Sequence, residues 1–176
     1  GQHLDMRFER QEIVRADEYL TMIEGKSAAL LAASAQMGAL VSSGDLASAE
    51  HYRLFGLNLG LAFQIRDDIL GIWGDPAVTG KSAATDILSR KKSLPVLFGL
   101  DHSTALRELY AREPFGDAEV AEAVHLLNAV GARDYAASLE SDYHRRTLAA
   151  LEAAQPTGPA AEGLAGLLST LLDRIA

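Results

Sequence analysis

The apolar positions of this chain recur with helical spacing along most of its length. The pattern predicts one helix over residues 17–41, which Asp17 is placed to cap, and another over residues 45–73, which Asp45 is placed to start. Shorter helices are expected from Leu94 onward and over residues 103–111, 117–130, 133–154 and 159–175. Because β-branched residues do not cluster in alternating runs, the sequence predicts an all-α fold in a single domain.

The second half of the 45–73 helix is apolar on almost every side, which is typical of a segment buried all round. It nevertheless contains two adjacent carboxylates, Asp67 and Asp68. A buried ionised carboxylate without a partner is energetically costly, so a positive group is expected to face them. Residues three and four apart share a helix face, so the two acids fall on one polar stripe with Gly60, Gln64 and Gly71. Such a stripe is typical of a helix that lines a cavity in a bundle.

Composition and charge exclude several classes of protein. With 176 residues, 48% of them hydrophobic, the chain can bury a sizeable core. A net charge of −8 gives no electrostatic footprint for nucleic acid or an anionic membrane surface. The sequence has no cysteine for disulfides or thiolate chemistry, and its five histidines lack metal-ligand spacing. It also has no apolar run that could span a membrane and no signal peptide, so a cytoplasmic protein is expected.

Basic residues gather around a long connection over residues 76–93, although the chain is acidic overall. Carboxylates that hold a hard cation, surrounded by lysines, are typical of a site for a phosphate-bearing substrate. Mg²⁺ fits best, because it is bound by one or two carboxylates together with the phosphates. The acidic members are Asp67, Asp68 and Asp86, and the basic members are Lys26, Lys81, Arg90, Lys91 and Lys92. Taken alone, Lys26 also fits a lysine whose stem lies on the core and whose ammonium stays in water.

Several short motifs follow one another at fixed spacing. They are Phe63-Gln64-x-x-Asp67-Asp68-x-x-Gly71, then Gly74-Asp75, Gly80-Lys81, Asp86 and Lys91-x-Ser93-Leu94-Pro95, with Gly1-Gln2-x-x-Asp5 and Lys26-Ser27 upstream. Together they resemble the second aspartate-rich region, and the segment before it, of the trans-polyprenyl diphosphate synthases. This is the family of the farnesyl and geranylgeranyl diphosphate synthases, and the resemblance covers roughly residues 1–100.

The resemblance implies an all-α bundle of the isoprenoid synthase type around a deep cavity. It implies a prenyltransferase in which Mg²⁺-dependent ionisation of an allylic prenyl diphosphate is followed by attack of isopentenyl diphosphate and loss of a proton. Carried over by position, Asp67 ligates the metal and Asp68 ligates it or holds its waters. Lys26, Lys81 and Lys91 contact the allylic diphosphate by the same resemblance, and Ser27 and Gln64 lie beside the reacting carbons. Phe63 faces the isopentenyl diphosphate, and Asp5 contacts metal-bound water or a basic residue.

Two departures from the family pattern change what we expect of this chain. Gly71 stands where the second motif usually ends in a third aspartate, and a neighbouring water or Asp68 could compensate. The first aspartate-rich motif and the basic residues for isopentenyl diphosphate are absent. We therefore expect residues 1–176 to be the C-terminal part of one polyprenyl synthetase domain and to be inactive alone. The resemblance implies a homodimer, and a separate chain could supply the N-terminal half.

Two alternatives assign the same residues to other functions. A class I terpene cyclase ionises the same substrates without condensing them, but the second metal motif typical of those enzymes is not visible in this sequence. A non-catalytic helical subunit that completes another synthase chain is the second alternative. Against it, a purely structural subunit has no need to bury charges such as those of Asp67 and Asp68.

Overall fold

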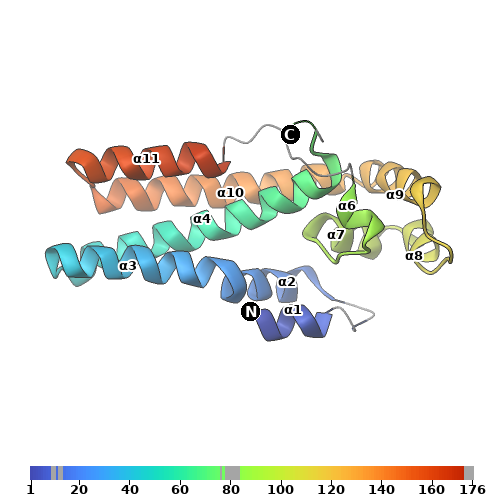
Figure 1. The fold of residues 1–176 in the computed structure, drawn as a ribbon, viewed down its shortest axis with the longest axis horizontal. Helices are drawn as coiled ribbons and strands as arrows, with labels where there is room; N and C mark the ends of the chain where they lie inside the picture. Colours follow the sequence, from blue (N-terminus) through green and yellow to red (C-terminus); the bar gives the residue numbers. More distant parts are fainter. Residues whose placement is uncertain (9–10, 12–13, 76, 78–83, 173–176) are drawn as a thin grey trace. The chain divides into compact units, whose positions relative to one another are not determined.

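The computed structural model describes residues 1–176 except 9–10, 12–13, 76, 78–83 and 173–176. Figure 1 shows its helices: α1 (Gln2–Phe8), α2 (Ala16–Ile23), the π-helical turn η1 (Glu24–Ala28), α3 (Ala29–Ser43), α4 (Leu46–Trp73), α6 (Thr85–Leu88), α7 (Leu94–His102), α8 (Thr104–Tyr110), α9 (Asp117–Ala129), α10 (Ala132–Ala154) and α11 (Gly158–Leu172). The described residues form no strand, so the predicted all-α fold is confirmed. Within the same residues, no helix combines the length and the hydropathy that a membrane span requires.

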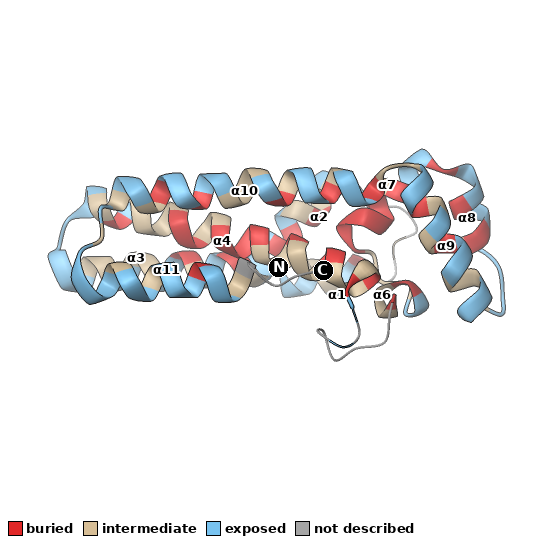
Figure 2. Cartoon of the chain, turned by 90° about the horizontal axis from the view of Figure 1, so that it is seen from above, coloured by how far each residue is buried: buried red, intermediate tan, exposed pale blue. Residues whose placement is uncertain are grey.

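The chain forms two compact units, and each is described by itself. Unit 1 comprises Gly1–Gln2, Leu20–Gln64 and Leu139–Arg174. Unit 2 comprises His3–Tyr19, Ile65–Ser138 and Ile175–Ala176. Helix α4 contributes to both, because the division falls after Gln64. Figure 2 shows buried positions along much of α4, whereas α10 and α11 keep largely exposed outer faces.

Helix α4 begins where the sequence predicts. The carboxylate of Asp45 accepts hydrogen bonds from Ala47 N (3.1 Å) and Ser48 N (3.0 Å), so Asp45 is the N-terminal cap. In unit 1, the apolar face of α4 forms a core with α10 and α11. The buried members of this core are Phe55, Leu59, Ala62, Ala150 and Leu168.

Two glycines one turn apart bring η1 and α3 close to α4 in unit 1. A Cβ on Gly60 would lie 2.5 Å from Cα of Ala28, and a Cβ on Gly56 would lie 2.5 Å from the carbonyl oxygen of Leu31. Both contacts are to backbone or to the stem of a short side chain, which cannot move aside without moving its helix. The two glycines therefore fix the distance between α4 and the segment that carries Lys26 and Ser27.

The predicted helix over residues 17–41 is interrupted. A π-helical turn, η1, separates α2 from α3 and contains Lys26 and Ser27. Such turns insert an extra residue into an α-helix and occur frequently at functional sites. The expected capping position of Asp17 is wrong, because α2 begins at Ala16 and Asp17 lies inside it. Glu18 accepts a hydrogen bond from the backbone N of Arg15 (3.0 Å) at the helix start.

Unit 2 contains the short helices α6 to α9, of which α6 lies within the 76–93 connection. Their core includes Ile72 of α4, Ile87 of α6, Val96 of α7, Leu106 of α8 and Leu127 of α9. Pro95 lies in the first turn of α7, and Ser103 caps α8 by accepting from Leu106 N at 3.1 Å. The predicted helices from residue 94 onward are thus all found. The ends that can be compared lie within three residues of those expected, and the expected end of the last helix at residue 175 lies outside the described residues.

The close approach at Gly60 predicts opposite effects for two glycine substitutions. Gly60→Ala is expected to lower the free energy of unfolding by about 1–3 kcal/mol, because the added methyl overpacks the contact with Ala28. Gly38→Ala, in the middle of α3 with nothing within 4 Å of its Cβ, is expected to raise it by about 0.5–1 kcal/mol. Urea unfolding followed by circular dichroism measures both. Equal effects of the two substitutions would contradict the close contact.

Candidate functional site

The most deeply buried charge in unit 2 belongs to Asp68, whose side chain has no exposed surface. Its Oδ2 accepts hydrogen bonds from the hydroxyl of Tyr19 (2.5 Å) and from Leu94 N (3.1 Å). Its Oδ1 accepts from Nζ of Lys91 at 3.2 Å. Lys91 is thus the positive group that the burial of this carboxylate requires. Asp68 thus accepts three hydrogen bonds from protein donors, one of them from Lys91.

Lys91 joins Asp68 to a second carboxylate. Its Nζ donates to Oδ2 of Asp86 at 2.8 Å, and its side chain is 40% exposed. Burial lowers the pKa of Lys91, but the neighbouring charges of Asp68 and Asp86 outweigh burial and raise it above the ordinary value. Burial and the charge of Asp68 likewise raise the pKa of the Tyr19 hydroxyl. Both donors therefore keep their protons at neutral pH.

Asp67, the neighbour of Asp68 on α4, lies in a different environment. It is half-buried and forms no hydrogen bond or ion pair with the described residues. Those residues also contain no group of three or more histidine or carboxylate side chains that could hold a metal ion by themselves. Mg²⁺ commonly takes one or two protein carboxylates and completes its shell with phosphate oxygens and water. The carboxylate of Asp67, which has no partner among the described residues, fits that use more readily than that of Asp68, which already accepts three hydrogen bonds.

In unit 1, the structure brings together the predicted pair Ser27 and Gln64. The hydroxyl of Ser27, in η1, donates to Oε1 of Gln64 on α4 at 3.1 Å. Phe63 is half-buried and packs against the hydrophobic core of α4, α10 and α11. Lys26, next to Ser27, is exposed. The π turn thus sets Ser27 against the polar stripe of α4.

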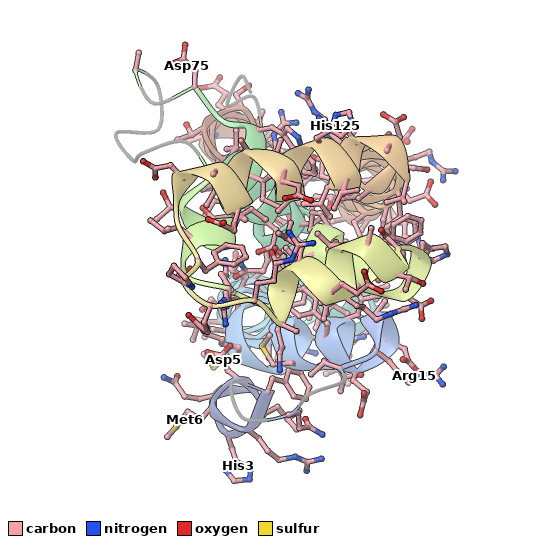
Figure 3. The ribbon with its side chains drawn as sticks, turned by 90° about the vertical axis from the view of Figure 1, so that its right-hand side faces the viewer. His3, Asp5, Met6, Arg15, Asp75 and His125 are labelled. Atoms are coloured by element: carbon pink, nitrogen blue, oxygen red, sulfur yellow. The ribbon has the colours of Figure 1, made fainter. Side chains whose placement is uncertain are left out.

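Other predicted site residues are placed as follows. Asp5 is half-buried on α1, and Figure 3 shows it on the opposite side of that helix from His3. Lys81 lies outside the described residues. Arg90 and Lys92, which the sequence groups with the anion site, have other partners in the structure. Arg90 pairs with Glu113 (2.9 Å), and Lys92 donates to the carbonyl oxygen of Phe8 (2.8 Å).

Tyr19 was not predicted to take part in the site. It is buried in unit 2, and its hydroxyl binds a carboxylate 49 residues away in the sequence. A tyrosine within an apolar helix face requires a partner for its hydroxyl, and this is the one signal the sequence offers. No local pattern identifies that partner.

The arrangement defines an all-α protein of the isoprenoid synthase type. A buried carboxylate–lysine network and a carboxylate without a partner among the described residues lie next to each other in the sequence of α4. Comparison with known families agrees: the model of the family described as "Polyprenyl synthetase" matches residues 1–127. The chain therefore belongs to the polyprenyl synthetase family.

Relatives and solved structures of this family are similar over most of the chain. The (2E,6E)-farnesyl diphosphate synthase of Mycobacterium tuberculosis H37Rv is 42% identical over 146 residues, covering 78% of this chain and 41% of that protein. The short chain isoprenyl diphosphate synthase of Methanothermobacter thermautotrophicus is 36% identical over 99% of this chain and 54% of its own length. A polyprenyl synthetase structure from Streptomyces coelicolor superposes with a TM-score of 0.86 at 32% identity, covering 97% of this chain and 54% of that one. The chain thus spans about half the length of the relatives it matches.

The two neighbouring aspartates are predicted to differ in their effect on stability. Asp68→Asn is expected to lower the free energy of unfolding by about 2–3 kcal/mol, because it removes the charge that pairs with Lys91 inside unit 2. Asp67→Asn, which removes a carboxylate without a described partner, is expected to change it by less than about 0.5 kcal/mol. Urea unfolding without added metal compares the two. Similar losses for both variants would contradict the different environments.

The raised pKa values of Tyr19 and Lys91 predict a loss of stability at alkaline pH. Their ordinary values are 10.0 and 10.5, so above pH 10 the unfolded chain releases these protons before the folded protein does. The folded state then binds more protons, and the free energy of unfolding falls as pH rises. Urea unfolding between pH 9 and pH 11 measures the slope. Tyr19→Phe and Lys91→Met are each expected to make the slope shallower, and unchanged slopes would refute this origin.

Proposed function

We propose that this chain takes part in prenyl transfer, in which an allylic prenyl diphosphate condenses with isopentenyl diphosphate and pyrophosphate is released. The observation that carries the proposal is the pair of unlike carboxylates on α4. Asp68 accepts three hydrogen bonds from protein donors, and its neighbour Asp67 has no partner among the described residues. Names of relatives support the same chemistry, since they are farnesyl, geranylgeranyl and short chain isoprenyl diphosphate synthases.

Asp67 is the residue that would hold Mg²⁺. When bound, Mg²⁺ supplies positive charge that stabilises the departing pyrophosphate. Asp68 supports this role indirectly, because its two oxygens fix Lys91 and the start of α7 at Leu94 N. We therefore propose that Asp68 acts as a positioning residue, where the sequence predicts a residue that ligates the metal or holds its waters.

Lys91 is arranged to bind the diphosphate. An ammonium group has three N–H donors, and the described contacts use two of them, one on Asp68 and one on Asp86. With 40% of its side chain exposed, Lys91 can direct the third donor to a phosphate oxygen. We assign Lys26 and Lys81 further contacts to the same diphosphate on the basis of the family resemblance.

Ser27 and Gln64 would stabilise positive charge on the reacting carbons. The hydroxyl of Ser27 donates its one hydrogen bond to Gln64, which leaves the lone pairs of the Ser27 oxygen available to a cationic centre. Phe63 would face the isopentenyl group, and Asp5 would contact a basic residue or metal-bound water. We further propose that the chain works with a segment that carries the first aspartate-rich motif, in the same polypeptide or in another, and within a homodimer.

The proposal predicts binding of magnesium pyrophosphate by the 176-residue chain. In isothermal titration calorimetry with Mg²⁺ and inorganic pyrophosphate, Asp67→Asn is expected to weaken binding by about tenfold or more, because a ligand to the metal is lost. Asp134→Asn, an exposed carboxylate on α10, is the matched control and is expected to leave the dissociation constant unchanged.

Turnover distinguishes the proposal from its alternatives. We expect no elongation of an allylic diphosphate by the chain alone, and incorporation of labelled isopentenyl diphosphate once a polypeptide with the first aspartate-rich motif is added. Pyrophosphate release without use of isopentenyl diphosphate would favour a terpene cyclase. A chain that binds no magnesium pyrophosphate but activates a partner synthase would favour the non-catalytic subunit.

A further inference from the structure

Gly71 lies directly under the carboxylate of Asp86 in unit 2. A Cβ on residue 71 would stand 2.6 Å from both Cγ and Oδ2 of Asp86 and 2.9 Å from its Oδ1. These separations are far inside the usual contact distance between carbon and other heavy atoms. The carboxylate of Asp86 therefore occupies the volume that a side chain at residue 71 would need.

Asp86 is fixed in this place by two bonds to Lys91. Its side-chain Oδ2 accepts from Nζ of Lys91 at 2.8 Å, and its backbone oxygen accepts from Lys91 N at 2.8 Å. The side chain of Asp86 is only 16% exposed. It cannot swing away from Gly71 without releasing the ammonium group of Lys91.

The backbone around Asp86 is also held in one shape. Ala84 (φ 54°) and Arg90 (φ 52°) flank α6, and both have the left-handed conformation that non-glycine residues rarely adopt. Ile87 is fully buried, and the guanidinium of Arg90 binds Glu113 (2.9 Å) and the carbonyl oxygen of Arg112 (2.7 Å). These contacts offset the strained conformation and direct Asp86 toward α4. They also give Arg90 a role that its place in the sequence did not reveal.

We propose that Asp86 is a positioning residue whose carboxylate, seated against Gly71, holds Lys91 beside Asp68. The carboxylate missing from residue 71 is then supplied from α6, and glycine is required at 71 to admit it. Neither a water nor Asp68, the compensations expected from the sequence, has to fill this place. The consequence for diphosphate binding rests on the proposed function, whereas the packing of Asp86 against Gly71 does not.

A double-mutant cycle in thermal stability tests the packing of the Asp86 carboxylate against Gly71 independently of function. Gly71→Ala and Asp86→Ala are each expected to lower the midpoint of unfolding. In Gly71→Ala/Asp86→Ala the new methyl enters the space that the carboxylate has left, so the combined loss is expected to be smaller than the sum of the single losses. Gly38→Ala combined with Asp86→Ala is the matched control and is expected to be additive, because Gly38 has nothing within 4 Å of its Cβ. Additive losses at Gly71 and Asp86 would contradict the packing of Asp86 against Gly71.

Binding of inorganic pyrophosphate in the presence of Mg²⁺ tests the positioning role. Gly71→Ala and Asp86→Ala are each expected to weaken binding by about tenfold, and the double variant by no more than Asp86→Ala alone. Gly71→Asp/Asp86→Ala returns a carboxylate to the same volume and is expected to bind more tightly than Gly71→Ala/Asp86→Ala. Gly38→Ala is expected to bind like the unaltered chain.

The results separate the two proposals. If the unaltered chain binds pyrophosphate and Asp86→Ala binds equally well, Asp86 does not position Lys91 for the ligand and the inference fails. If the unaltered chain does not bind pyrophosphate but the stability cycle is non-additive, the proposed function fails and the packing of Asp86 against Gly71 is supported.

Discussion

The burial of the Asp68 carboxylate is the constraint on which the site in unit 2 depends. An ionised group without solvent must be surrounded by donors, and here they come from α2, the start of α7 and the connection before it. Tyr19 and the segment from Lys91 to Leu94, which are distant from each other and from Asp68 in sequence, are therefore brought together at its two oxygens. Tyr19 and Leu94 N saturate one oxygen, which leaves the other to hold Lys91.

This constraint gives two adjacent aspartates different tasks. A step of one residue along α4 rotates the side chain by about 100°, which is enough to take Asp67 out of the hydrogen-bond network around Asp68. Asp86 extends the network to a second carboxylate, so that Lys91 lies between two acids and keeps its proton. The result is an ammonium group fixed between two acids, while Asp67 has no partner among the described residues.

Glycine determines how closely these parts can approach. Gly60 admits the backbone of η1 in unit 1, and Gly71 admits a carboxylate in unit 2. In the sequence both are small residues on one stripe of a helix, and the sequence pattern does not distinguish their roles. Their different neighbours, a helix backbone in one case and the side chain of Asp86 in the other, become visible only when the chain is folded.

The sequence by itself determined the helical class and the extent of α4 from its cap at Asp45. It also determined the motif that places Asp67, Asp68 and Lys91 in one family pattern. Helical periodicity, capping and motif spacing are local properties, and the sequence is sufficient for them. It did not determine the π turn at Ser27, the partner of Tyr19 or the pairing of Arg90 with Glu113. Those depend on which segments meet, and the sequence pattern carries no distance between them. The tertiary structure decided them because every buried polar group must find a partner among whatever groups packing brings within reach.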